Sequence, residues 1–216
     1  VSAEGSPVSP KGRPEGESSP KRVSAEGRLT TGGLVVVTGA SGFVGAALVA
    51  RLRAAGRPLL GTVREVQAGM PGDLQPVGDL ARAPDDLLDD LVSGAHAVVH
   101  LAGRAHVMRE TVADPEAAYR LANAETTARL ARASVRAGVR RFVLASSVKA
   151  AGEASPPGRP LAPGDPPHPE DAYGRSKLAA EGELLGIASG TPMAAVALSY
   201  QVAINFSFDE SITQQM

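Results

Sequence analysis

From Leu34 onward, short apolar runs alternate with longer segments of helical periodicity. Runs rich in Val, Leu and Ala that are bounded by Gly or polar residues are typical of buried strands. They occur at 34–38, 57–63, 74–80, 95–103, 140–147 and 191–198. Segments whose apolar residues recur three and four positions apart predict helices, and these lie between the runs at 43–56, 84–92, 115–139 and 170–185.

This order of elements predicts the fold class. Continuously apolar strands that alternate with helices indicate a parallel sheet covered on both faces. Right-handed crossovers between such strands give an α/β, Rossmann-type doubly wound sheet. We therefore expect one nucleotide-binding domain over residues 34–198.

The two ends of the chain differ from this domain. Residues 1–33 are rich in Ser, Pro, Gly and charged side chains and contain no aromatic residue, so we expect a disordered tail. After Leu198 the apolar residues alternate with small or polar ones, which is typical of a half-exposed strand at risk of aggregation. Because composition also changes there, our hypothesis is that 199–216 is an atypical tail from a frameshift, a fusion or a misjoined reading frame.

Composition narrows the class of protein. The chain has 216 residues, enough for one medium domain with a real core, and a net charge of −1 gives no electrostatic reason to expect nucleic acid or an anionic membrane as partner. It has no cysteine, so neither a disulfide framework nor a thiolate site is expected. No apolar run approaches the roughly 20 residues of a membrane span, and the N-terminus lacks a signal-peptide core. We expect a cytoplasmic protein.

A glycine-rich loop directly follows the first predicted strand. The segment TGASGFVG places Gly39, Gly42 and Gly45 between strand and helix, with Phe43 and Val44 inside the pattern. Gly39 permits a tight turn, Gly42 lets the backbone approach a pyrophosphate, and Gly45 lets the helix pack on the strand. The N–H groups at the helix start then face the anion. The alternative is a glycine turn with no ligand, but the position after the first strand favours a dinucleotide site.

The end of the second strand bears on the choice between NAD and NADP. A carboxylate there would bind the ribose hydroxyls and favour NAD. Val63 takes this position and Arg64 follows, and an arginine can pair with a 2′-phosphate, which slightly favours NADP. A solvated Arg64 at a strand end is the alternative.

Tyr173 and Lys177 lie one turn apart at the start of a predicted helix and share one face. A tyrosine with its ordinary pKa of about 10 is a poor base at neutral pH. A nearby cation favours the phenolate and lowers that pKa, so Lys177 is suited to activate Tyr173 for removing a hydroxyl proton. Lys177 could also hold the cofactor ribose, and we expect both residues to contact the cofactor. The alternative is an exposed aromatic residue with a lysine neighbour.

The glycine loop, the VVHLAG segment at 98–103 and the Tyr-x-x-x-Lys pair together resemble the extended short-chain dehydrogenases/reductases. Within them, residues 34–198 are most similar to the NAD-dependent epimerase/dehydratase family that acts on nucleotide sugars. The resemblance implies an enzyme that uses NAD or NADP and a UDP- or dTDP-linked sugar, and that can form a homodimer.

The same resemblance implies roles for further residues. Ser147 would polarise the substrate oxygen, with a strand-end cap as the alternative. Asp79 and Leu80 would lie beside the adenine, Ala102 and Gly103 along the dinucleotide, and Asn123 on the ribose side. Asp79 as a turn residue and Asn123 as an exposed helix position are the alternatives. The proline-rich segment 155–171 would form a stiff loop over the mouth of the site.

The sequence departs from the epimerase/dehydratase family at two places, and it shows no pattern typical of a metal site. Ala151 stands where relatives often have a tyrosine, and the segment that would lead to their substrate-binding lobe is replaced by the atypical tail. A non-catalytic dinucleotide-binding protein and a ketone or alcohol reductase therefore remain alternatives. The four histidines, among them His100, show no metal-ligand spacing, so no metal is expected.

Overall fold

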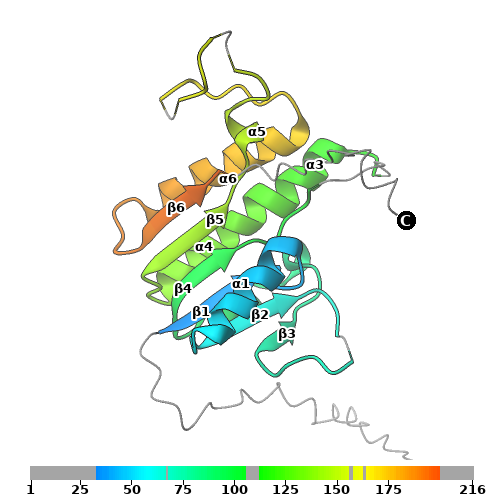
Figure 1. The fold of residues 1–216 in the computed structure, drawn as a ribbon, viewed down its shortest axis with the longest axis vertical. Coiled ribbons are helices and arrows are strands. Elements are labelled where there is room, and N and C mark those ends of the chain that lie inside the picture. The colour runs from blue at the N-terminus through cyan, green and yellow to red at the C-terminus, as the bar shows by residue number, and fades with distance from the viewer. Residues whose placement is uncertain (1–32, 67, 106–111, 156–157, 163, 200–216) are drawn as a thin grey trace, which may run out of the picture.

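The structure is a computed structural model that describes residues 33–66, 68–105, 112–155, 158–162 and 164–199 (Figure 1). The two predicted tails lie outside the described residues, except for Gly33 and Ser199. The tail hypotheses therefore stay predictions.

Six parallel strands form one sheet in the order β3-β2-β1-β4-β5-β6, and this confirms the α/β doubly wound class (Figure 1). The chain starts in the middle of the sheet, builds outward to β3, returns to β4 and continues to the other edge. The strands are β1 Leu34–Thr38, β2 Leu59–Val63, β3 Leu74–Pro76, β4 Ala95–His100, β5 Arg141–Ala145 and β6 Ala194–Leu198.

Helices connect the strands near the predicted positions. Gly56 and Gly138 follow two of them with φ of 64° and 71°, a left-handed conformation that ends a helix and suits glycine. The predicted helix at 115–139 consists of three consecutive segments with a π-helical turn in the middle. The helices are α1 Phe43–Ala54, η1 Leu80–Arg82, α2 Asp85–Val92, α3 Pro115–Tyr119, the π-helical η2 Arg120–Glu125, α4 Thr126–Arg136, α5 Val148–Ala151 and α6 Ala172–Ala188.

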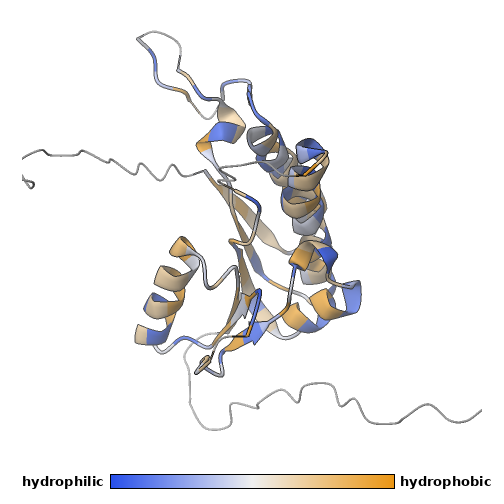
Figure 2. Cartoon of the chain, turned by 90° about the vertical axis from the view of Figure 1, so that its right-hand side faces the viewer, coloured by the Kyte–Doolittle hydropathy of each residue, from blue (hydrophilic) through white to orange (hydrophobic). Residues whose placement is uncertain are grey.

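The two faces of the sheet are covered unequally. α1 packs alone on one face, where Val49 joins Val35 and Val37 of β1. On the other face, α2, α4 and α6 bury a larger cluster that includes Phe142 and Leu184. Seen along the edge of the sheet, α1 stands on one side and the remaining long helices on the other (Figure 2).

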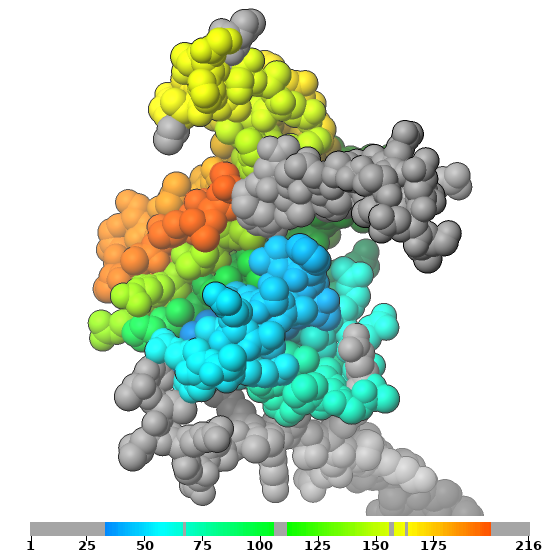
Figure 3. Space-filling model, in the orientation of Figure 1, coloured from blue at the N-terminus to red at the C-terminus, as the bar shows by residue number. Residues whose placement is uncertain are grey.

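The half of the sheet formed by β5 and β6 departs from the prediction. Val196 and Leu198 of β6 point to the α1 side and are 47% and 53% exposed. Both crossovers into this half run on the opposite face, so no described helix covers these residues, and β6 reaches the molecular surface (Figure 3). The predictions of a sheet covered on both faces and of a buried strand at 191–198 are wrong here.

Candidate active site

The glycine loop forms a close contact between the ends of β1 and β4. Gly39 has a φ of 70°, and a Cβ there would lie 2.8 Å from the Ala102 nitrogen. A Cβ on Gly45 would lie 2.1 Å from the Gly39 carbonyl oxygen, so α1 packs on the loop at a distance that only glycine permits. No side chain caps the N-terminus of α1 at Gly42. Its first N–H groups and its dipole therefore favour an anion at this point.

A cavity of about 560 Å³ opens beside this loop, at the carboxyl ends of the strands. Its wall also includes residues from the ends of β2 and β4 and from η1. Seven predicted cofactor residues line it: Gly39, Gly42, Arg64, Asp79, Leu80, Ala102 and Gly103. The other predicted residues do not, namely Phe43, Val44, Gly45, Asn123, Ser147, Tyr173 and Lys177.

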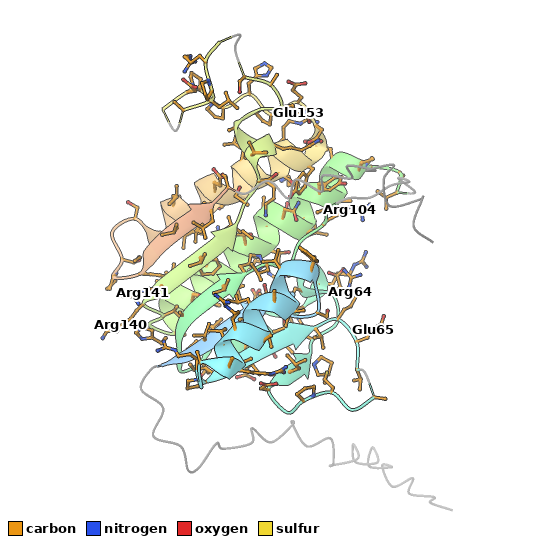
Figure 4. All side chains as sticks on the ribbon, viewed as in Figure 1. Arg64, Glu65, Arg104, Arg140, Arg141 and Glu153 are labelled. Carbon is orange, nitrogen blue, oxygen red and sulfur yellow. The ribbon has the colours of Figure 1, made fainter. Side chains whose placement is uncertain are left out.

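Two arginines contribute positive charge to the cavity wall. Arg64 and Arg104 lie at the same end of the sheet, far from Arg140 and Arg141 at its other end (Figure 4). The guanidinium of Arg104 lies over the Tyr119 ring, 5.2 Å from its centroid. Arg104 was not predicted, although its place directly after Gly103 was a signal for it.

Asp79 has a structural role in the same wall. Its carboxylate accepts a hydrogen bond from the Ala81 nitrogen at 3.1 Å and so caps η1. The turn role considered as an alternative is therefore present, at a position that also faces the cavity.

Thr38 joins β1 to β4, and sequence reasoning missed it. Its hydroxyl oxygen accepts from the nitrogens of Leu101 and Ala102 at 3.2 and 3.1 Å. Its own proton is then available for Nδ1 of His100, 2.7 Å away. The available signal was a hydroxyl residue at the end of an apolar strand, directly before the glycine loop.

His100 is a buried and neutral side chain. It is 1% exposed, and its ring packs edge-on against Phe142 at the end of β4. Since Nδ1 accepts the Thr38 proton, Nε2 carries the hydrogen of the neutral ring. Burial, and next the nearby Lys177 ammonium, lower the pKa of His100 to about 3.

Asn123 connects the cavity wall to α6. Its Oδ1 accepts from the Arg104 nitrogen at 2.8 Å, and its Nδ2 donates to the Arg104 carbonyl and to the Ser176 hydroxyl. Ser176 in turn donates to the Tyr173 carbonyl at 2.7 Å. Asn123 is 2% exposed, so the exposed helix position considered for it is wrong. It lies in η2, and π-helical turns are frequent at functional sites.

Tyr173 and Lys177 lie in the first turns of α6. Asp171 caps this helix, because its carboxylate accepts from the Gly174 nitrogen at 2.6 Å. The Tyr173 side chain is half-buried, and its ring lies 6.0 Å from that of Tyr119.

Lys177 reaches the carboxyl end of β5. It is 6% exposed, and its Nζ donates to the Ala145 carbonyl at 2.5 Å. Burial lowers the pKa of Lys177 to about 8, although Glu181 opposes the shift. A cation is thus held where β5 ends.

The two serines that follow β5 have different partners. Ser146 donates to the Glu181 carboxylate. Ser147 caps α5, because its hydroxyl oxygen accepts from the Lys149 nitrogen at 3.3 Å. The cap considered as an alternative for Ser147 is therefore present, and this bond still leaves the hydroxyl its own proton to donate.

The proline-rich segment projects away from the sheet beyond α5 (Figure 1). None of the residues that line the cavity comes from it. Ser147, Tyr173 and Lys177 do not line this cavity either, so the loop expected over the mouth of their site stays a prediction.

Comparison with known proteins identifies the family. The model of the NAD dependent epimerase/dehydratase family matches residues 35–202, most of the chain. The chain belongs to this family. The match includes the glycine loop, the cavity wall and the Tyr173–Lys177 helix, and it confirms the resemblance inferred from those motifs.

Individual relatives of this epimerase/dehydratase domain agree with that assignment. A UDP-glucose 4-epimerase of Vibrio cholerae is 37% identical over 163 residues, which are 75% of this chain and 49% of the relative. A UDP-glucose 4-epimerase of Brucella ovis, solved with NAD, is 28% identical with a TM-score of 0.67, and the match covers 78% of this chain and 52% of that one. MoeE5, solved with UDP-glucuronic acid and NAD, is 35% identical with a TM-score of 0.66 over 77% and 54% of the two chains.

The chain spans about half the length of these relatives. In the part of the chain that the structure describes, no helix is long and apolar enough to cross a membrane.

Proposed function

We propose that this chain binds NAD in the cavity beside the glycine loop and contributes a Ser147–Tyr173–Lys177 hydride-transfer site for a nucleotide sugar. The observation that supports this most directly is the buried Lys177 ammonium, which is on the same helix as Tyr173 and contacts the Ala145 carbonyl, two residues before Ser147. The family is NAD-dependent, and MoeE5 holds NAD and a UDP-sugar.

The residues of the cavity fit a dinucleotide. Gly39, Gly42 and Gly103 line the cavity, and glycines without side chains let a ligand approach the backbone closely. The uncapped start of α1 and two arginines suit the negative charge of a pyrophosphate. NAD, when bound, supplies the acceptor and donor of hydride.

The three residues have separate parts in the chemistry. Tyr173 as phenolate takes the proton of the sugar hydroxyl while the hydrogen on the same carbon leaves as hydride, which converts the alcohol to a ketone. Lys177 stabilises the phenolate by its charge. Ser147 donates a hydrogen bond to the substrate oxygen. Return of hydride to the opposite face of the ketone, with return of the proton, would complete an epimerisation.

The test is cofactor binding followed by turnover. We expect the chain to quench or shift NADH fluorescence, and Tyr173→Phe to keep that binding within about twofold. Interconversion of UDP-glucose and UDP-galactose should fall on the order of 10²-fold or more in this variant, because the base is lost. Parallel titration with NADPH checks the preference expected from Arg64, since equal affinities would contradict it.

A second candidate is a dinucleotide-binding chain without catalytic activity. The observation that favours it is the cavity, because none of Ser147, Tyr173 and Lys177 lines it. NADH binding with no turnover of any UDP- or dTDP-sugar would support this candidate. Turnover of a simple ketone or alcohol would instead support a reductase, and no binding of NADH would contradict all three.

A further inference from the structure

Lys149 lies between the two elements that carry Ser147 and Tyr173. Its backbone nitrogen donates to the Ser147 hydroxyl, and its Nζ leaves α5 to reach Asp171 Oδ2 at 2.7 Å and Glu153 Oε1 at 2.8 Å. Glu153 follows α5 at the end of the molecule where α6 begins (Figure 4). One lysine thus contacts both the cap of α5 and the cap of α6.

The Asp171 carboxylate uses both of its oxygens in this arrangement. One accepts from Lys149, and the other accepts from the Gly174 nitrogen in the first turn of α6, next to Tyr173. Burial by itself would raise the pKa of Asp171, but the Lys149 ammonium and the Gly174 amide hold it below its usual range. Asp171, followed by Glu153, raises the pKa of Lys149 above its usual range.

The backbones of α5 and α6 meet at the same point. A Cβ on Gly174 would lie 2.5 Å from the Lys149 carbonyl oxygen, so only glycine allows this approach. The His168 nitrogen also donates to the Ala151 carbonyl at 2.9 Å, which ties the chain before α6 to the end of α5. The Lys149–Asp171 pair therefore joins two elements that are already in backbone contact.

The energy of this ion pair is small, so its main effect is on position and charge. Both side chains are 41% exposed, and an ion pair so open to solvent contributes little to stability. Loss of Lys149 would nevertheless remove the hydrogen-bonded cation of Asp171 and Glu153, and Asp171 would keep only the influence of Arg175. Negative charge beside a phenol disfavours the phenolate.

We propose that Lys149 is a positioning residue, which holds the strand-end serine and the helix of Tyr173 in register and balances the two carboxylates beside that helix. This inference rests on the proposed function, because it concerns the same Ser147–Tyr173 pair. Lys149 is not among the residues that line the cavity, so substitution of Lys149 should have little effect on cofactor affinity.

Other charged or titratable groups near the start of α6 remain in place in the test. Their interactions are known from the structure and do not involve Lys149. They are Lys177, Arg175 with its partner Glu116 on α3, and Tyr119 with Arg104.

The test compares Lys149→Met with Lys149→Arg in the whole chain. The pKa of Tyr173 is read from phenol absorbance, with Tyr173→Phe to assign the signal, and exchange of the Gly174 amide is read by NMR. We expect Lys149→Met to raise the pKa of Tyr173 by about half a unit or more and to speed Gly174 exchange severalfold. Lys149→Arg should restore the pKa, because the charge remains.

Arg159→Met is the matched control. It breaks an ion pair with Asp165 at 2.9 Å inside the segment that connects α5 to α6. Because this pair includes neither Lys149 nor Asp171, its loss should change neither readout. Both readouts work without NADH, so failure of the chain to bind NADH would refute the proposed function and leave this test standing.

If Lys149→Met does not fold, the double variant Lys149→Met/Asp171→Asn, which removes both charges, replaces it. This double variant should also speed Gly174 exchange. A wild-type pKa and wild-type Gly174 exchange in Lys149→Met, or in the double variant wild-type exchange, would overturn the proposal.

Discussion

The buried charge of Lys177 affects both the stability of the fold and the proposed chemistry. Its ammonium is held at the Ala145 carbonyl in a place where burial disfavours the charged form. In the proposed function this ammonium would stabilise the Tyr173 phenolate, so the burial that opposes folding would serve the proposed chemistry.

The pH dependence of stability should report this burial. The pKa of Lys177 in the fold is about 8, below its ordinary value of 10.5, so between these values the unfolded chain binds more protons than the folded one. Stability should therefore rise with pH over this window, by at most about 3 kcal/mol. Lys177→Met should lack this rise. Urea denaturation at pH 7.5 and pH 10 measures it, and equal changes in the two proteins would contradict the buried charge.

The sequence predicted the motif residues of the site but not the side-chain contacts between residues far apart in the chain. The glycine loop, Tyr173 and Lys177 are close in sequence or lie in recognisable patterns, and the structure places them on the expected elements. Asn123 meets Arg104 across 19 residues and Ser176 across 53. Such partners depend on how α3, η2 and α6 pack, and local periodicity contains no information about that.

At the scale of elements, α1 and α6 make opposite use of glycine. In α1, Gly45 has no room for a side chain, because a Cβ would meet the backbone of Gly39 and Ala40. In α6, Gly182 has nothing within 4 Å of the position a Cβ would take. The first glycine is required by packing, and the second only costs the helix conformational entropy.

Alanine substitution should therefore have opposite signs at these two positions. Gly45→Ala should destabilise the protein by roughly 2 kcal/mol or more, because backbone atoms must move, and should weaken NADH binding. Gly182→Ala, the matched control, should stabilise by about 0.5 to 1 kcal/mol through helix propensity. Thermal unfolding measures both changes, and a neutral Gly45→Ala would mean that the loop relaxes freely.

At the scale of the whole molecule, the order of apolar runs predicted the strands, the helices and the class of sheet. It did not predict which face each crossover would cover, because an apolar strand does not specify where the helices before and after it will pack. For β5 and β6 both covering helices lie on one side, and Val196 and Leu198 remain exposed on the other. Adjacent exposed apolar side chains of this kind favour association.

Polar substitution on this face should reduce self-association. We expect Val196→Thr/Leu198→Thr to bind less of a hydrophobic dye and to sediment with less aggregate, while the strand survives because threonine suits β structure. Val66→Thr is a suitable control, because Val66 is 73% exposed in a different part of the chain. Equal sedimentation of the double variant and the wild type would show that the face does not drive association.

The amide of Asn123 also has a thermodynamic consequence. It bonds to both sides of the Arg104 peptide and, through Ser176, to the backbone of Tyr173. A ligand that displaces Arg104 in the cavity wall must move the Asn123 amide or strain its hydrogen bonds. These bonds lead through Ser176 to Tyr173, whose phenol proton is the one that the proposed reaction removes. Coupling of this kind is reciprocal. Ionisation of Tyr173 would then change ligand affinity by the same factor by which the ligand changes ionisation, and the cavity would act as a sensor of that single proton.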